Sequence, residues 1–306
     1  MAEDTNRHKD NAPPTGWRLW WIAARPKTLS ISMVPVVVGT AVAWAETATA
    51  SLVVAVVALL SALFIQTGTN LYNDAADHDR GTDTQARLGP KRVTAEGWIA
   101  ARKVYGAAAL CFVIASAAGC YLIWLGGWPI LVLGIVSLFS GYWYSGGPKP
   151  LAHTAFGEAF VFAFFGLGAV GGTYYLHTGA YSMGALVAGS AVGLLASAVM
   201  LVNNYRDFDS DFEAGRVTLA IRVGRPASKF VFAAFLLGAY LMLIPWAASG
   251  EHWSAIAFAA PALPVFAFLI YRFWREPLGA AFNRILAQTA LAQVVFGVLL
   301  SVGLVV

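Results

Sequence analysis

Charged residues are scarce in this chain. Only 12% of its 306 residues are Asp, Glu, Lys or Arg, whereas 58% are hydrophobic and the mean hydropathy is +0.66. A soluble domain carries about 25% charged residues, so this shortage excludes an ordinary water-soluble protein. The lipid bilayer is the first expected partner. The net charge of +4 is explained by membrane orientation, and no nucleic-acid partner is expected.

Cysteine is almost absent. The two cysteines, Cys111 and Cys120, lie nine residues apart in one apolar run. At about 100° per residue they point to opposite faces of a helix, so we expect no disulfide between them. A cleavable signal peptide is not apparent either, because the first apolar run begins late and lacks a clear cleavage pattern.

Long apolar runs recur along the chain. A spanning helix needs about 20 mostly apolar residues. Runs of this kind predict nine transmembrane helices, at 28–45, 52–73, 103–125, 128–145, 155–176, 182–205, 229–249, 253–273 and 282–306. We therefore expect an all-α, polytopic membrane protein with nine helices around a central cavity open to the cytoplasmic side. This domain covers 17–306 and follows a disordered cytoplasmic tail at 1–16.

Basic residues fall in only one set of the connecting segments. No Lys or Arg occurs in the turns near 46–51, 126–127, 177–181 and 250–252. All twenty basic residues lie in the N-terminal arm and in the alternate segments. Under the positive-inside rule this places the N-terminus in the cytoplasm and the C-terminus outside.

Half of the sixteen carboxylates lie in two short clusters, 70–83 and 203–213. Each cluster follows an apolar run at its expected cytoplasmic end and opens with the pattern Asn-x-Tyr-x-Asp. Carboxylates are costly near hydrocarbon, so each cluster is a candidate functional site. Carboxylate and amide oxygens are the ligands that Mg²⁺ uses when it also holds a substrate diphosphate.

Helical spacing aligns the oxygen ligands of each cluster. Residues three or four apart share a helical face, which places together Asn70, Asp74 and Asp77 in one cluster and Asn203, Asp207 and Asp211 in the other. The two runs are four predicted helices apart, so both clusters have the same membrane orientation. This favours a parallel internal duplication with two stripes facing each other across a cavity; the alternative is a pair of solvated helix ends.

Positive charges accompany the acids at the same membrane face. The segment 144–150 reads Tyr-Ser-Gly-Gly-Pro-Lys-Pro, where glycines let the backbone approach a ligand and Lys149 offers a point charge. Arg25 and Lys27 precede the first run, and Arg222 follows the second cluster. Taken singly, each is more readily a topology determinant. Together with the acids they describe a site for a Mg²⁺-bridged diphosphate whose apolar tail runs into the lipid.

Four stretches resemble the UbiA-type intramembrane prenyltransferase superfamily, and within it most closely the branch that prenylates 1,4-dihydroxy-2-naphthoate in menaquinone biosynthesis. They are 25–29, 70–83 with Gly89-Pro90, 144–158 and 203–224. Nine helices is the usual number in that family. One departure is Arg216, which stands where a Lys is common in that branch and so keeps the charge but changes its geometry.

The resemblance implies an enzyme of a bacterial cytoplasmic (inner) membrane. It would transfer a polyprenyl chain from polyprenyl diphosphate to 1,4-dihydroxy-2-naphthoate, with release of CO₂ and diphosphate, and give a demethylmenaquinone. Mg²⁺ is the implied cofactor. Another aromatic acceptor such as 4-hydroxybenzoate is the alternative within the family. A cation transporter is a remote alternative, because its acidic motifs would normally lie at mid-membrane in inverted halves.

The resemblance also assigns roles to particular residues. The implied metal ligands and catalytic acids are Asp74, Asp77, Asp207 and Asp211, with Asp83 as a further ligand or loop support. Asn70, Asn73 and Asn203 would bind substrate or orient the metal shells, and Lys149 and Arg222 would contact phosphate. Tyr72 and Tyr205 would shield an allylic cation through their ring faces, with helix packing as the alternative. Arg25 or Lys27 would bind the carboxylate of the acceptor.

Overall fold

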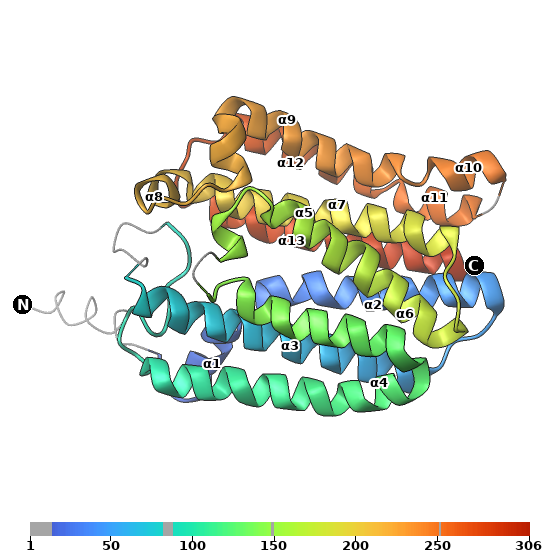
Figure 1. Cartoon of the computed structure of the whole chain (residues 1–306). Helices are drawn as coiled ribbons and strands as arrows, with labels where there is room; N and C mark the ends of the chain where they lie inside the picture. Colours follow the sequence, from blue (N-terminus) through green and yellow to red (C-terminus); the bar gives the residue numbers. More distant parts are fainter. Residues whose placement is uncertain (1–13, 82–87, 148–149, 251) are drawn as a thin grey trace, which may run out of the picture.

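The computed structural model describes residues 14–81, 88–147, 150–250 and 252–306, and within these ranges the chain is helical and contains no β-strand (Figure 1). The all-α prediction is therefore confirmed for the described part of the chain. The predicted tail up to residue 13, the candidate ligand Asp83 and the candidate phosphate ligand Lys149 lie outside the described residues.

The helices run side by side in one elongated bundle (Figure 1). Their bounds are α1 (Trp17–Ala24), α2 (Pro26–Thr47), α3 (Leu52–Asp79), α4 (Ala101–Trp143), η1 (Leu151–His153), α5 (Gly157–Val161), η2 (Phe162–Gly168), α6 (Ala169–Thr178), α7 (Met183–Arg206), α8 (Phe208–Glu213), α9 (Leu219–Leu241), α10 (Ile244–Ser249), α11 (Trp253–Ala259), α12 (Ala262–Arg275) and α13 (Phe282–Val305). Of these, η1 is a 3₁₀ turn and η2 is a π-helical segment.

Seven helices of the described chain are long and apolar enough to cross a membrane, or up to eight if the bent pair α11–α12 is one span. The sequence predicted nine, and much of the difference arises in α4, which contains 43 residues. A straight helix of that length would measure about 65 Å, roughly twice the hydrocarbon core of a bilayer. Gly127 breaks it with φ 67° and ψ −151°, and Figure 1 shows the chain doubling back there into two arms.

α7 is the most enclosed of the candidate spans, because 78% of its apolar 18-residue stretch is buried inside the protein. Glycines bring its backbone against η2: a Cβ added to Gly166 would lie 2.5 Å from the carbonyl oxygen of Gly189 and 2.7 Å from the Cα of Gly193. Such close backbone approach is typical of small residues between membrane helices. The rigid contact fixes α7, and with it the second acidic cluster at its end.

The two acidic clusters lie at the same end of the bundle. α3 ends at Asp79 and α7 ends at Arg206, and in Figure 1 both ends lie at the left together with α8. The C-terminus lies at the opposite end. Both cysteines of α4 are free, as the helical spacing predicted.

Candidate active site

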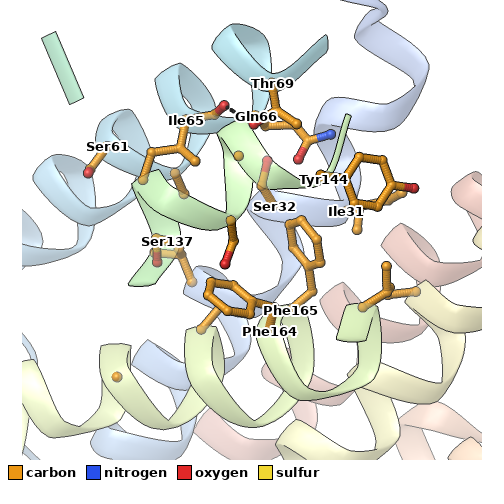
Figure 2. A pocket seen from close by; sticks show the side chains of 18 of the residues that line it. Ile31, Ser32, Ser61, Ile65, Gln66, Thr69, Ser137, Tyr144, Phe164 and Phe165 are labelled. Atoms are coloured by element: carbon orange, nitrogen blue, oxygen red, sulfur yellow. Dashed lines mark hydrogen bonds between the residues drawn. The ribbon is translucent and has the colours of Figure 1, made fainter. Parts of the chain in front are cut away.

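A cavity of about 310 Å³ lies among α2, α3, the second arm of α4 and the segment η2–α6 (Figure 2). One end is polar, and its lining includes Arg25, Asn70, Asn73 and Asn203. Most of the remaining wall is apolar, including Ile31, Ile65, Leu133, Phe164 and Phe165. Figure 2 shows the two phenylalanines of η2 facing the side chains of α3 across the cavity. The space suits a molecule with a polar head and a hydrocarbon tail.

Arg216 joins the two acidic clusters. Its Nη1 lies 2.9 Å from Oδ1 of Asp211, and its Nη2 lies 3.7 Å from Oδ1 of Asp77. The structure therefore brings one carboxylate of each cluster to a single guanidinium. Arg216 follows α8, and its own backbone N–H donates to the carbonyl of Asp211 over 2.9 Å.

Asp77 is the most heavily surrounded of the acids. Only 2% of its surface is exposed, and Nη1 of Arg92 lies 2.7 Å from its Oδ2. Nδ2 of Asn73 donates to the same oxygen over 3.2 Å, and also to the hydroxyl of Ser145 over 2.7 Å. A buried carboxylate needs such compensation, because removal of its partners leaves an unpaired charge at a cost of several kcal/mol.

Asp74 and Asp207 face other partners. Asp74 accepts from the backbone N–H groups of Val93 (3.3 Å) and Thr94 (3.1 Å) and from the Thr94 hydroxyl. Asp207 accepts from two nitrogens of the Arg206 guanidinium, Nε at 2.8 Å and Nη2 at 2.6 Å. Asp77 and Asp211 thus share Arg216. Asp74 instead binds the backbone of Val93 and Thr94, and Asp207 binds the neighbouring Arg206.

Arg206, the partner of Asp207, also connects the end of α7 to α13. Its Nη1 donates to Oδ1 of Asn283 at the start of α13 over 2.8 Å, and its Nη2 donates to Oδ1 of Asn203 over 2.9 Å. Nδ2 of Asn283 in turn donates to the carbonyl of Leu88 over 2.8 Å. The segment after the first cluster is therefore tied to the end of α7 through two side chains.

Asn70 fastens the break between α1 and α2. Its Nδ2 donates to the carbonyl of Ala24 over 2.8 Å and to the hydroxyl of Thr28 over 3.1 Å. Between them Arg25 has a left-handed backbone, with φ 53°, which is uncommon for a residue other than glycine. The Arg25 side chain thereby reaches the polar end of the cavity, where Nη1 donates to Oδ1 of Asn73 over 3.0 Å.

Tyr72 and Tyr205 do not line this cavity. The Tyr72 ring packs against Tyr105 and Tyr142, with centroids 5.4 Å and 5.3 Å apart. Tyr205 is buried against Phe273, with centroids 4.6 Å apart. In this structure both rings serve helix packing, the alternative that the sequence left open.

Two of the predicted substrate ligands are also outside the cavity. Lys27 and Arg222 are exposed, and neither belongs to the cavity lining. Lys27 lies in the first turn of α2 and Arg222 near the start of α9. Their roles, as substrate ligands or as topology determinants, stay predictions.

Two lining residues were not singled out from the sequence. Gln66 lies one turn before Asn70 on α3, and its Nε2 donates to Oδ1 of Asn70 over 3.4 Å (Figure 2). Extending the amide stripe backwards by four residues would have found it. Tyr144 lines the cavity and donates to Sδ of Met200 over 3.1 Å. Burial, and then the charge of Glu158, raises the pKa of Tyr144 above its usual range.

The η1 turn connects the segment after α4 to the segment after α8. The carbonyl of His153 accepts from the backbone N–H of Val217 over 2.9 Å. Burial, followed by the positive charge of Arg216, lowers the pKa of His153 to about 4. The imidazole is therefore neutral at physiological pH and adds no further cation beside Arg216.

The carboxylates at this site suit a metal ion that binds together with the substrate of the protein. Among the described residues, no three side chains of His, Cys, Asp or Glu cluster closely enough to hold a metal ion. Mg²⁺ is usually bound through one or two carboxylates, with substrate phosphates and water completing its shell. Asp77 and Asp211 supply two carboxylates around one cationic group, and Asn73, which donates to Asp77, lines the cavity. These residues fit Mg²⁺ in that form.

Solved structures share this architecture. A UbiA homologue from Archaeoglobus fulgidus bound to GPP and Mg²⁺ matches with a TM-score of 0.67 and 18% identity, covering 94% of this chain and all of that one (100%). The apo structure of a UbiA homologue from Aeropyrum pernix K1 matches with a TM-score of 0.66 and 18% identity, over 91% and 97% of the two chains. At these identities the likeness concerns the fold.

Curated relatives are more similar in sequence. The 1,4-dihydroxy-2-naphthoate octaprenyltransferase of Haemophilus influenzae is 32% identical over 299 residues, which cover 94% of this chain and 96% of that protein. The protein of the same name from Bacillus subtilis is 31% identical, over 94% and 93% of the two chains. The model of the UbiA prenyltransferase family matches residues 32–301. The chain belongs to the UbiA prenyltransferase family, and it is a prenyl-transferring enzyme.

Proposed function

We propose that the protein transfers a polyprenyl chain from a polyprenyl diphosphate to 1,4-dihydroxy-2-naphthoate, releasing diphosphate and CO₂ and forming the reduced, dihydroxy form of a demethylmenaquinone (a demethylmenaquinol). The observation that carries this proposal is the cavity, whose polar end holds Arg25 and Asn73 and whose remaining wall is mostly apolar. Asn73 contacts Asp77, which in turn shares Arg216 with Asp211. The names of the curated relatives support the choice of acceptor.

The head of the donor would lie at the polar end of the cavity. Asp77 and Asp211 are the first candidates to hold Mg²⁺, whose charge lowers the barrier to departure of the diphosphate. Asp74, Asp207 and Asp83 remain candidate ligands, and the first two would have to exchange their present donors. Arg222, near the start of α9, and Lys149, outside the described residues, are proposed to contact the phosphates.

Ionisation of the allylic C–O bond leaves the bonding electron pair on the diphosphate and a cation on the prenyl carbon. The electron-rich ring then forms a new C–C bond at the carbon that carries the carboxylate, and loss of CO₂ returns its bonding pair to the ring. Tyr144, Phe164 and Phe165 line the cavity and would keep water from the cation. Arg25, which lines the cavity, would bind the acceptor carboxylate, with Lys27 as the outer candidate.

We further propose nine membrane crossings. Each arm of α4 would cross as a span of its own, and the bent pair α11–α12 would cross as one span. The acidic clusters and the polar end of the cavity would then face the cytoplasm of a bacterial cell and the C-terminus the outside. Charge placement supports this orientation, because the turns at the opposite end lack Lys and Arg. A C-terminal reporter that is active only outside the cytoplasm would test it.

The acceptor is tested with purified protein in detergent, Mg²⁺ and a radiolabelled polyprenyl diphosphate. We expect prenylated product and CO₂ from 1,4-dihydroxy-2-naphthoate and no product from 4-hydroxybenzoate, with all turnover lost in excess EDTA and restored by Mg²⁺. Product from the benzoate would move the protein to another acceptor branch. Turnover that persists in EDTA would exclude the metal assignment.

The cavity wall predicts how chain length is limited. Gly134 lines the cavity, and a Cβ added there meets no atom within 4 Å. It lies deeper than Tyr144, by about 15 Å along the helix. Gly134→Leu is therefore expected to fold and to retain transfer of a short prenyl chain, while transfer of a long chain falls by about tenfold or more.

Gly106 provides the matched control. It lies in the first arm of α4, its Cβ position is equally open, and it does not line the cavity. Gly106→Leu should leave the ratio of long-chain to short-chain turnover unchanged. An unchanged ratio in Gly134→Leu as well would show that the tail does not run along this wall.

A further inference from the structure

We propose that Arg216 is an exchangeable counter-cation of the metal site. Its guanidinium pairs with Asp77 and Asp211 when no metal is bound. When Mg²⁺ and prenyl diphosphate bind, the same guanidinium leaves the two carboxylates and pairs with the diphosphate. This inference rests on the proposed function. It assigns to one side chain two successive partners in the same reaction cycle.

Charge balance is the first argument. Asp77 and Asp211 are buried, with 2% and 6% of their surfaces exposed. Two such carboxylates near one another repel unless a cation stands between them. Arg92 pairs with Asp77, whereas Arg216 is the cation between the two acids, because one guanidinium nitrogen is directed to each. A divalent ion between the same carboxylates would replace this charge and make the guanidinium redundant there.

The contact geometry indicates that the Arg216 guanidinium can leave its two carboxylate partners. Its ion pair with Asp211 uses one short contact of 2.9 Å, and its approach to Asp77 is 3.7 Å. Arg206, by contrast, grips both oxygens of Asp207 at 2.8 Å and 2.6 Å. Paired contacts of the second kind are the strong form of an arginine–carboxylate interaction. Of these two arginines, Arg216 is therefore the one with the weaker hold on its acids.

The base of the side chain stays fixed while its head has room to pivot. The backbone N–H of Arg216 donates to the carbonyl of Asp211, and the next residue, Val217, donates to the carbonyl of His153, both over 2.9 Å. The Arg216 side chain is 15% exposed, so it is not fully enclosed. A guanidinium that swings about this anchor keeps its reach to a diphosphate held by the same two acids, and its planar fork suits phosphate oxygens.

The exchange predicts effects of opposite sign for two ligands. Without diphosphate, Arg216 competes with the metal for the carboxylates, so its removal should tighten metal binding. With prenyl diphosphate present, Arg216 contributes to binding, so its removal should weaken the bound substrate. A merely structural arginine would lower both affinities together.

The experiment compares Arg216→Gln with wild type as folded, full-length protein in detergent. Mn²⁺ alone is titrated and its free signal is followed by electron paramagnetic resonance. Geranyl S-thiolodiphosphate, which ionises poorly, is then titrated in the presence of Mg²⁺. We expect Mn²⁺ to bind about tenfold or more tightly to the variant, since a unit charge a few ångströms away contributes more than a decade at an effective dielectric constant of about 20. The thiolodiphosphate should bind about tenfold or more weakly.

Two further variants make the result decisive. Arg225→Gln removes the arginine that pairs with the exposed Asp209 of the same cluster, and should change neither affinity. Arg216→Lys keeps the charge but loses the fork, so it should tighten Mn²⁺ binding less than Arg216→Gln and retain the thiolodiphosphate. Unchanged or weaker Mn²⁺ binding in both Arg216 variants would overturn the exchange.

Failure of the proposed function would look different. In that case wild-type protein would not bind the thiolodiphosphate at all, whereas the Mn²⁺ titration would still report whether Arg216 competes for the acids. The two arms therefore test the inference and the function separately.

Discussion

Asp211→Asn is expected to lower turnover by about 10²–10³-fold, the scale on which loss of one key electrostatic group acts in an active site. Asp211 is the member of the second cluster that meets Asp77 through Arg216. An amide of the same shape keeps one oxygen but loses the negative charge that would hold a divalent metal against the diphosphate. Initial rates at saturating donor and acceptor, measured over a range of Mg²⁺ concentrations, check the prediction.

The neighbouring acid supplies the control. Asp209 lies two residues away in the same helix, its side chain is 74% exposed, and it pairs outward with Arg225. Asp209→Asn should keep turnover within about twofold, as is usual for a surface ion pair. Equal losses in the two variants would mean that the net charge of the cluster matters and that Asp211 has no special position.

Asp74→Asn is expected to reduce turnover just as severely, but for a structural reason: the segment that contains Val93 and Thr94 would be held less firmly against α3. The Asp74 carboxylate accepts from two backbone N–H groups and a hydroxyl of Val93 and Thr94, and it is 1% exposed. An asparagine would turn an N–H₂ group towards one of these donors. The cost should be about 2–4 kcal/mol, because hydrogen bonds to a buried charge are lost and a donor is left unpaired.

Hydrogen exchange distinguishes this role from metal ligation. In metal-free protein, Asp74→Asn should speed exchange of the Val93 and Thr94 amides and lower the midpoint of thermal unfolding, whereas Asp211→Asn should leave those two amides protected. Asp79→Asn serves as the comparison, because Asp79 is exposed and accepts from the Tyr105 hydroxyl, a contact that needs only an oxygen acceptor. Normal protection at Val93 and Thr94 in Asp74→Asn would return Asp74 to the candidate metal ligands.

The sequence predicts the helices well where hydrophobic length decides the outcome. The runs at 52–73, 182–205 and 282–306 correspond to α3, α7 and α13, because about 20 apolar residues can satisfy their backbone in lipid only as a helix. It also predicts that the two clusters share one end of the bundle. The division of α4 was predicted as two separate runs, and Gly127 supplies the break between them.

Side-chain partners are the part that the sequence does not determine. Asp74 and Asp77 share a helical face by spacing, yet one is directed to the backbone of Val93 and Thr94 and the other to Arg92 and Arg216. The choice depends on how distant loops fold back over the end of α3, which local periodicity does not encode. For the same reason the spacing could not show that Tyr72 and Tyr205 pack away from the cavity, since a helical period marks a face but not its neighbour.

The tie that runs from Leu88 through Asn283 to Arg206 has a mechanical consequence. It joins the segment after α3 to the end of α7 and the start of α13, so we expect these parts of the chain to move together. Asn283 belongs to neither acidic cluster, yet its side chain makes both hydrogen bonds of this connection, and a shorter side chain there should let the two parts move independently.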